Sequence, residues 1–142
     1  MIKHENSEKL QVKAEKERLN EIIQFVDDIL MKAHCPMKTQ LIIEVAVEEI
    51  FINIASYAYV KMNSDENIVE IECGVLDHTI YLSFKDKGKA YNPLEKKDPN
   101  LNVSIDQRTI GGLGIYMVKS MVDEISYEHL DDTNILYIKK NF

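Results

Sequence analysis

Cysteine is scarce in this sequence, and its scarcity argues against two kinds of covalent or metal cross-link. The 142 residues include two cysteines, Cys35 and Cys73, and neither lies in a paired-cysteine motif or near histidines at metal-ligand spacing. A structural zinc site and a disulfide framework are therefore unsupported. We expect both side chains to be buried, reduced thiols.

Long hydrophobic runs are missing as well. The sequence has no stretch of about 18 uninterrupted apolar residues, the length that a membrane-spanning helix needs. The N-terminal segment 1–6 is polar apart from Met1 and Ile2, whereas a secretory signal would carry an apolar run there. We therefore expect a cytoplasmic protein with no membrane partner.

The chain also has fewer positively charged than negatively charged residues. Lysine and arginine number 17 against 24 aspartates and glutamates, which gives a formal charge of −7. This charge opposes direct binding to nucleic acid or to an anionic membrane surface, and it favours a basic or amphipathic partner. A chain of this length, with 45% hydrophobic residues, can bury one core but not two, so we expect a single domain over residues 1–142.

Apolar periodicity predicts the order of helices and strands. Ile80, Leu82 and Phe84 alternate with polar neighbours as in a half-buried strand, and Thr39 is the expected N-cap of a helix. The predicted elements are a strand over 10–14, helices over 17–33 and 40–59, a hairpin of 68–75 and 79–85, a long connection over 87–110, a helix over 112–122, and a hairpin of 125–130 and 135–140 around the turn 131–134. The expected fold class is α+β, a two-layer sandwich with helices on one face of a mixed, mainly antiparallel sheet.

The helix over 40–59 carries polar side chains in an otherwise apolar segment. At 100° per residue, Glu49 and Asn53 lie about 40° apart on one face, whereas Glu44 and Glu48 turn toward another side. On a rigid wall, the Asn53 amide oxygen can ligate magnesium, and the Glu49 carboxylate can orient or deprotonate an attacking hydroxyl or water. Alternatively, these two side chains only hydrogen-bond each other or nearby backbone across a partly wet helix face.

Asp86 and Gly88 follow the alternating strand. A carboxylate at a strand end beside a tight turn can face a cavity and accept a hydrogen bond from an exocyclic amine such as adenine N6. The glycine would let the base approach the backbone closely. The alternative is ordinary turn chemistry, in which aspartate and glycine only end the strand.

Glycine is rare in this chain, yet three of its five glycines lie together in Gly111-Gly112-Leu113-Gly114 at the start of an apolar helix. Glycine within a helix is less stable than alanine by about 0.5–1 kcal/mol, so the cluster suggests that something approaches the backbone. Phosphate is the natural candidate, because a helix N-terminus offers free amides and a positive dipole end. A Walker loop is excluded, since its lysine and hydroxyl pair is missing. A flexible loop leading into a packing helix is the alternative.

Together these segments resemble a known family. Glu49-x-x-x-Asn53, Asp86-x-Gly88 and Gly112-x-Gly114-x-x-x-Val118 look like the N, G1 and G2 boxes of the GHKL ATPase superfamily, and the resemblance covers about residues 40–140. The short chain, with Gly-Gly-Leu-Gly-Ile before Val118, is similar to the anti-sigma-factor serine/threonine kinases of the RsbW type. That group implies a Bergerat-type sandwich that binds ATP and Mg²⁺, phosphorylates a serine on a STAS-type anti-anti-sigma protein, and alternatively binds a sigma factor. A homodimer is a further expectation from the group.

The resemblance also implies roles for individual residues. Asn53 would coordinate Mg²⁺, Glu49 would be the catalytic base, and Asp86 would contact the adenine amine. Further nucleotide contacts would come from the glycine-rich segments and the ATP lid over about 94–110; the residues involved are Gly88, Ala90, Arg108, Gly111, Gly112, Leu113 and Gly114.

Two positions depart from the family pattern. Ala90 stands where members often have a second G1 glycine, and Tyr57 stands where they have a histidine. Alanine narrows the approach to the backbone, and tyrosine cannot become a cation near neutral pH.

Two classes of function are therefore open. One is an ATP-dependent serine/threonine kinase that acts as a regulatory switch. The other is a non-catalytic module that holds a regulator and uses nucleotide only as a conformational ligand. We do not expect a gyrase-type machine or a sensor histidine kinase, because we find neither a transducer domain nor a phosphoacceptor-histidine hairpin.

Overall fold

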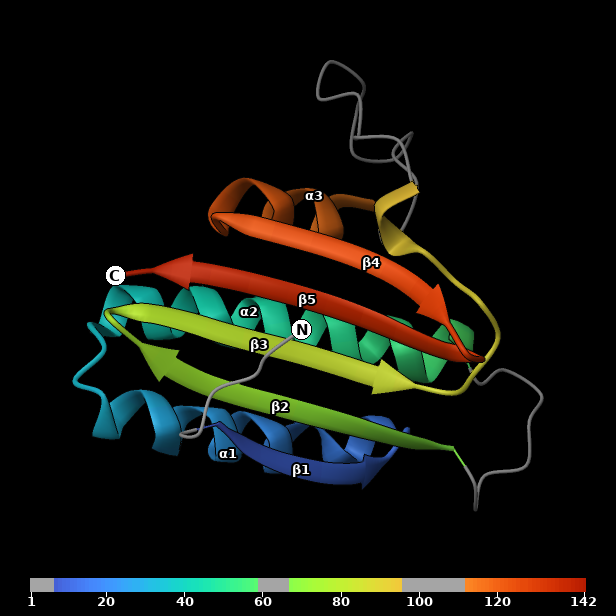
Figure 1. Ribbon diagram of the computed structural model, residues 1–142, viewed down its shortest axis with the longest axis horizontal. Coiled ribbons are helices and arrows are strands. Elements are labelled where there is room, and N and C mark those ends of the chain that lie inside the picture. Colours follow the sequence, from blue (N-terminus) through green and yellow to red (C-terminus); the bar gives the residue numbers. More distant parts are fainter. Residues whose placement is uncertain (1–6, 59–66, 96–111) are drawn as a thin grey trace.

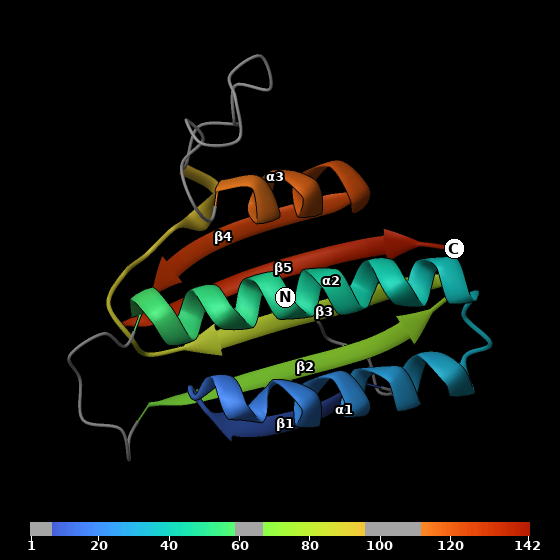
Figure 2. The same cartoon turned by 180° about the vertical axis from the view of Figure 1, so that it is seen from behind.

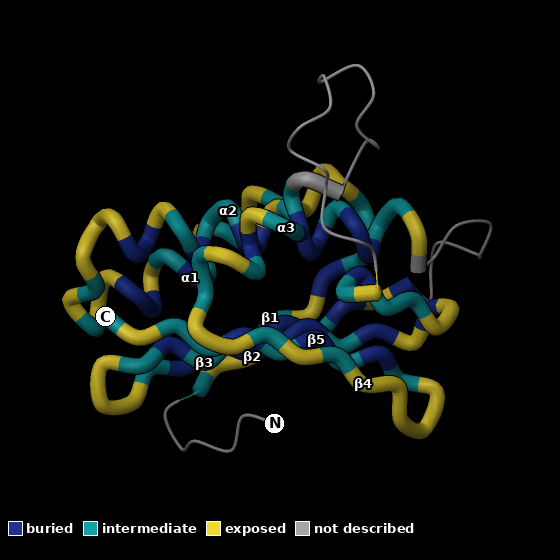
Figure 3. The backbone as a smooth tube through the Cα atoms, turned by 90° about the horizontal axis from the view of Figure 1, so that it is seen from above, coloured by how far each residue is buried: buried dark blue, intermediate teal, exposed yellow. Residues whose placement is uncertain are grey.

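The computed structural model describes residues 7–58, 67–95 and 112–142. Within these ranges, α-helices and strands form two layers (Figure 3), and short helical turns occur in some of the connections. In chain order the elements are β1 (Glu8–Lys13), η1 (Lys16–Arg18), α1 (Leu19–Lys32), α2 (Met37–Asn53), the π-helical turn η2 (Ile54–Ala58), β2 (Ile68–Leu76), β3 (Thr79–Asp86), η4 (Pro93–Glu95), α3 (Gly112–Met121), β4 (Glu124–Leu130) and β5 (Thr133–Asn141).

The strands form one five-stranded sheet in the order β1-β2-β3-β5-β4 (Figure 1). All four pairings between the described strands are antiparallel, so the parallel pair of a mixed sheet is not found among them. The reason is the position of β5. Both β3 and β4 are antiparallel to β5 and so run in the same direction, but β5 lies between them and pairs with each.

The three α-helices of the described ranges cover one face of the sheet. They lie behind the sheet in Figure 1, in front of it in Figure 2, and in a separate layer above it in Figure 3. The predicted α+β two-layer sandwich is therefore confirmed. None of the helices within the described ranges combines the length and apolar character that crossing a membrane requires.

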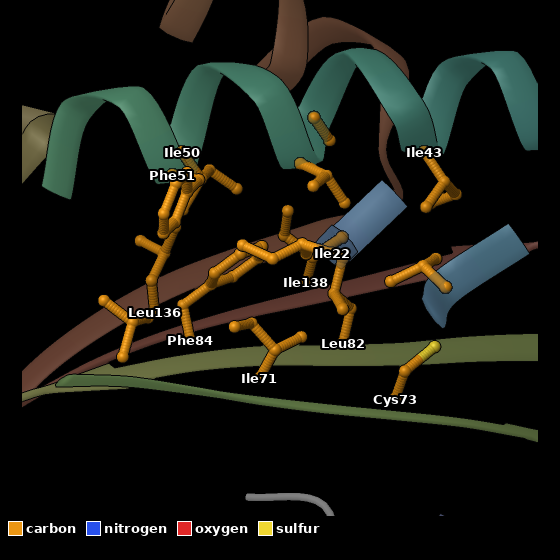
Figure 4. Close-up of a cluster of buried hydrophobic side chains, with 14 of the residues drawn as sticks. Ile22, Ile43, Ile50, Phe51, Ile71, Cys73, Leu82, Phe84, Leu136 and Ile138 are labelled. Carbon is orange, nitrogen blue, oxygen red and sulfur yellow. The ribbon is translucent and has the colours of Figure 1, made fainter. Parts of the chain in front are cut away.

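The core lies between α1, α2 and the helix-facing side of the sheet. Ile80, Leu82 and Phe84 are all fully buried there, as their alternation in the sequence predicts. Figure 4 shows Phe51 of α2 above Phe84 of β3, with aliphatic side chains from neighbouring strands around them. Cys73 is a free thiol buried in this core, as expected. Cys35 is also a free thiol but is only half-buried, so the expectation that it is buried is wrong.

Both hairpins turn on two residues with left-handed backbone. The turns are Asp77-His78, with φ of 51° and 59°, and Asp131-Asp132, with φ of 53° and 58°. Such turns match the twist of antiparallel strands, and aspartate tolerates this backbone conformation better than most residues. The second turn is shorter than predicted, because β5 begins at Thr133.

The second helix differs from the prediction at both ends. Its N-cap is Pro36, which has an extended backbone and makes no side-chain capping hydrogen bond. Thr39, the predicted N-cap, lies buried within the first turn instead. A proline at this boundary ends the preceding connection and lets α2 start at Met37. At the other end, regular helix stops at Asn53 and continues as the wider η2 turn, a form that often occurs at functional sites. The predicted end at Tyr59 lies outside the described residues.

Candidate active site

Asp86 is the last residue of β3 and is almost fully buried, with 4% of its surface exposed. Its Oδ1 accepts hydrogen bonds from the Gly88 amide at 2.9 Å and from Nδ2 of Asn134 at 2.9 Å. Neither bond uses Oδ2. Burial raises the pKa of Asp86, while these two hydrogen bonds and nearby His129 oppose the shift. Asp86 is thus a carboxyl held in a fixed orientation at the wall of a cavity.

Asn134 of β5 is the residue that fixes this orientation, and it was not singled out from the sequence. Its Nδ2 donates to Asp86, to the Lys89 carbonyl at 3.0 Å and to the Gly88 carbonyl at 3.4 Å. Its Oδ1 accepts from the hydroxyl of Tyr127 and lies 3.0 Å from Nδ1 of His129. The amide cannot be reversed without placing its oxygen against three acceptors.

The sequence placed Asn134 in a turn, where asparagine is common. The informative signal is cross-strand register: Asn134 is the β5 partner of Asp86 on β3. That pairing depends on the insertion of β5 beside β3, which local sequence does not specify.

Asn53 lies across a small cavity from Asp86. The end of α2, the end of β3 and the start of β5 lie at the same end of the sheet (Figure 1), and both residues line a cavity of about 20 Å³ together with Tyr91, Tyr127 and Asn134. Asn53 is 7% exposed, and no hydrogen bond from another described residue holds its amide. The cavity has room for a water-sized group. An adenine base would therefore require its walls to move apart.

Glu49 lies one turn before Asn53 and reaches the third helix. A Cβ built on Gly114, in the first turn of α3, would stand 2.8 Å from Oε1 of Glu49 and closer still to Cδ and Oε2. Burial, and then the neighbouring charge of Glu48, raise the pKa of Glu49. The predicted difference between the two glutamates is confirmed: Glu48 is exposed and Glu49 is half-buried.

The structure thus brings residues of all three predicted segments to one end of α2. Asn53 and Asp86 share a cavity, and Glu49 meets Gly114. Among the described residues, no group of three or more histidine, cysteine, aspartate or glutamate side chains could hold a metal ion. A metal here would take few protein ligands and would need oxygens from a substrate or water.

Residues 12–140 match the family model of the histidine kinase-like ATPase domain. The chain belongs to this family. Membership explains why the asparagine, aspartate and glycine segments converge, and it implies ATP as the ligand of the site.

Individual relatives and one solved structure are also similar to this chain. The serine-protein kinase RsbW of Staphylococcus aureus strain MSSA476 is 30% identical over 104 residues, and that of Staphylococcus epidermidis is 31% identical over 104 residues. Each alignment covers 68% of this chain and 65% of the relative. The fold is similar to a crystal structure of the RsbU and RsbW domains of a Mycobacterium tuberculosis protein, with a TM-score of 0.65 and 14% identity over 95% of this chain and 31% of that one.

Some residues predicted for the ATPase site are among the described residues, and others are not. Gly88 is buried in the turn after β3, and Ala90 is exposed beyond it. Gly112 and Leu113 begin α3. Arg108, Gly111 and residues 96–110 of the predicted lid lie outside the described residues.

Tyr57, which stands where the ATPase family often has a histidine, packs on the site from the η2 turn. Its ring stacks on that of Tyr91 with centroids 5.1 Å apart and an interplanar angle of 23°. Tyr91 lines the cavity, whereas Tyr57 is 45% exposed. At this departure from the family pattern, an aromatic ring thus packs against a residue of the cavity wall.

Proposed function

We propose that this protein is an ATP-dependent serine/threonine protein kinase of the anti-sigma-factor type. It would phosphorylate a serine of a STAS-type anti-anti-sigma partner in the cytoplasm and bind a sigma factor in an alternative complex. The observation that carries the proposal is the arrangement along α2: Asn53 faces the cavity of Asp86, and Glu49, one turn away, faces the start of α3. The likeness to serine-protein kinases named RsbW supports the same activity.

Asp86 would read the base. Its Oδ1 already accepts two hydrogen bonds, and Oδ2 would accept one from the exocyclic amine of adenine. A guanine would present a carbonyl oxygen to the same carboxylate, and two acceptors repel. The site would therefore select ATP over GTP.

Asn53 would ligate Mg²⁺. Its amide is not engaged by another described side chain and lines the cavity, so its oxygen fits the preference of Mg²⁺ for oxygen ligands. When bound, Mg²⁺ would neutralise charge on the phosphates. Because Mg²⁺ usually keeps waters and phosphate oxygens as ligands, one protein oxygen is enough.

Glu49 would act as the general base. It would take the proton from the partner's serine hydroxyl as that oxygen bonds to the γ-phosphorus, while the bond from the γ-phosphorus to the bridging oxygen breaks and ADP leaves with the electron pair. Partial burial raises the pKa of Glu49, which makes its carboxylate a stronger base. The predicted lid, Arg108 and the homodimer complete the proposal.

The test is transfer of labelled phosphate. The purified chain is incubated with Mg²⁺, γ-labelled ATP and a STAS-type protein from the same organism, and the label is expected on a serine of that protein. Glu49→Gln should abolish transfer and keep ATP binding, because it removes the base and leaves the pocket. ATP binding without any transfer by the parent protein would refute the kinase.

A second candidate is a non-catalytic module that sequesters a regulator and responds to nucleotide. The tyrosine stack favours it, since Tyr57 supplies no cation near neutral pH where family members often have histidine. Partner capture that survives Glu49→Gln, with no turnover in the parent, would support this candidate.

A further inference from the structure

Gly114 occupies a helix position that does not need glycine for its backbone. It lies inside α3, and its φ is not in the left-handed region. Glycine at such a position is less stable than alanine by about 0.5–1 kcal/mol. Glycine at position 114 is therefore explained by a lack of space for a side chain and not by the backbone conformation.

The space is filled by Glu49. The three heavy atoms nearest to a Cβ at position 114 are Oε2, Cδ and Oε1 of that side chain, and all lie too close for a real Cβ. No phosphate is needed to account for Gly114, although the sequence suggested one. The carboxylate of Glu49 lies where the side chain of any other residue would begin.

Packing on both sides limits how this contact can adjust. Ile115 and Val118 anchor α3 and are 2% and 0% exposed, and Ile50 anchors α2 beside Glu49 and is 1% exposed. The carboxylate is the far end of a flexible chain, and it is therefore the part that would move if a methyl group were added at position 114.

We propose that Gly114 is a positioning residue for Glu49, because the space left by its missing side chain holds the carboxylate at the place where it acts as the base. The inference rests on the proposed kinase function. It gives this glycine a role toward the protein's own carboxylate, in addition to the predicted phosphate contact.

The consequence is a catalytic defect without a defect in nucleotide binding. A methyl group on residue 114 would push the carboxylate out of its half-buried place, and a displacement of about 1 Å in a reacting group can lower a rate by about 100-fold. The displaced carboxylate would also be better hydrated, and its pKa would fall toward the ordinary value of glutamate. Asp86 and Asn53 would be untouched, so ATP affinity would be kept.

The experiment is a double-mutant cycle of Gly114→Ala and Glu49→Asp in the full chain. Aspartate is one methylene shorter, so its carboxylate would lie clear of an alanine methyl. Gly114→Ala should lower kcat for phosphate transfer about 100-fold in the parent and less than about threefold in the Glu49→Asp background. Ser120→Ala, which removes only a hydrogen bond to the Met117 carbonyl on the exposed side of α3, is the matched control and should change nothing.

A second readout is independent of activity. The titration of the Glu49 carboxyl, followed by carbon NMR, should move to lower pH in Gly114→Ala. Loss of thermal stability in Gly114→Ala that Glu49→Asp restores would also support the contact. An unchanged titration, or equal losses of kcat in both backgrounds, would overturn the role of Gly114. If the parent transfers no phosphate, the proposed kinase fails, and the titration alone decides whether Gly114 positions Glu49.

Discussion

The hydrogen-bond network around Asn134 makes a quantitative prediction for Asn134→Asp. The change keeps the shape of the side chain and replaces an amide donor by an acceptor. The new oxygen would face Oδ1 of Asp86, now 2.9 Å from Nδ2, and the Lys89 carbonyl, now 3.0 Å away. Two carboxylates would then be buried side by side, where the parent protein has one carboxylate and one amide donor.

The expected loss of stability follows from the bonds removed. A hydrogen bond to a charged group contributes about 1.5–3 kcal/mol, and a buried acceptor left without a donor adds about 1–3 kcal/mol. We expect the free energy of unfolding to fall by about 2–4 kcal/mol at pH 8, near the upper end for single substitutions. ATP affinity should fall about tenfold for each 1.4 kcal/mol lost from the proposed contact between Asp86 and adenine.

The loss should depend on pH with a definite sign. A second carboxylate raises the pKa of the pair in the folded protein above its value in the unfolded chain. Stability from such a pair is present at low pH and is lost as the pH rises through the folded pKa. At pH 5, one carboxyl can carry a proton and donate it to the other, so the difference from the parent should shrink.

Urea denaturation at pH 5 and pH 8, with ATP titration of each variant, checks this prediction. Asn141→Asp is the matched control on the same strand, because Asn141 is exposed and its Oδ1 only accepts from the Thr79 hydroxyl, which a carboxylate can also do. If Asn134→Asp behaves like Asn141→Asp in stability and in ATP affinity, Asn134 does not hold Asp86 and the account of the site is wrong.

Three further predictions concern other parts of the protein. Burial, and then Glu44, raise the pKa of Asp27 to about 6, so the contribution of Asp27 to stability is lost as the pH rises from about 4 to about 6. Asp27→Asn should therefore stabilise the protein at pH 8 by about 1 kcal/mol, because solvent partly screens the charge. The fall of Tm between pH 4 and pH 6 should be smaller in this variant than in the parent. Asn53→Ala should weaken ATP binding in the presence of Mg²⁺ but not in EDTA, and calorimetry showing equal affinities with Mg²⁺ would remove its ligand role. Burial raises the pKa of Cys73 to about 12, so a thiol reagent at pH 8 should modify half-buried Cys35 first and reach Cys73 only at the rate of unfolding.

Local pattern accounts for most of the fold. The alternation of Ile80, Leu82 and Phe84 predicts which side of β3 is buried, because side chains on a strand point to opposite faces in turn. The order of helices and hairpins is likewise set by short-range periodicity. Thr39 shows the limit of local pattern: Pro36 and Thr39 lie three positions apart and either can precede a helix, and the extended backbone of Pro36 makes Met37 the first helical residue.

The candidate site was predictable where it lies on one element. Glu49 and Asn53 share a helix, so helical geometry alone separates Glu49 from Glu48. Asn134 was not predictable in this way, because its role comes from a partner 48 residues earlier in the chain. The contact of Glu49 with Gly114 is also tertiary, and a glycine near a helix start suggests a phosphate equally well.

The insertion of β5 between β3 and β4 therefore has two effects that cannot be separated. It completes the hydrogen bonding of β3, and it sets Asn134 opposite Asp86 at the one end of the sheet where α2 also ends. A one-residue shift in that register would turn Asn134 to the far face and replace it with a neighbour that has no amide, because successive strand residues point to opposite faces. The orientation of the Asp86 carboxylate is thus set by the same pairing that holds the sheet together. A change that loosens β5 should weaken ATP binding and stability in parallel.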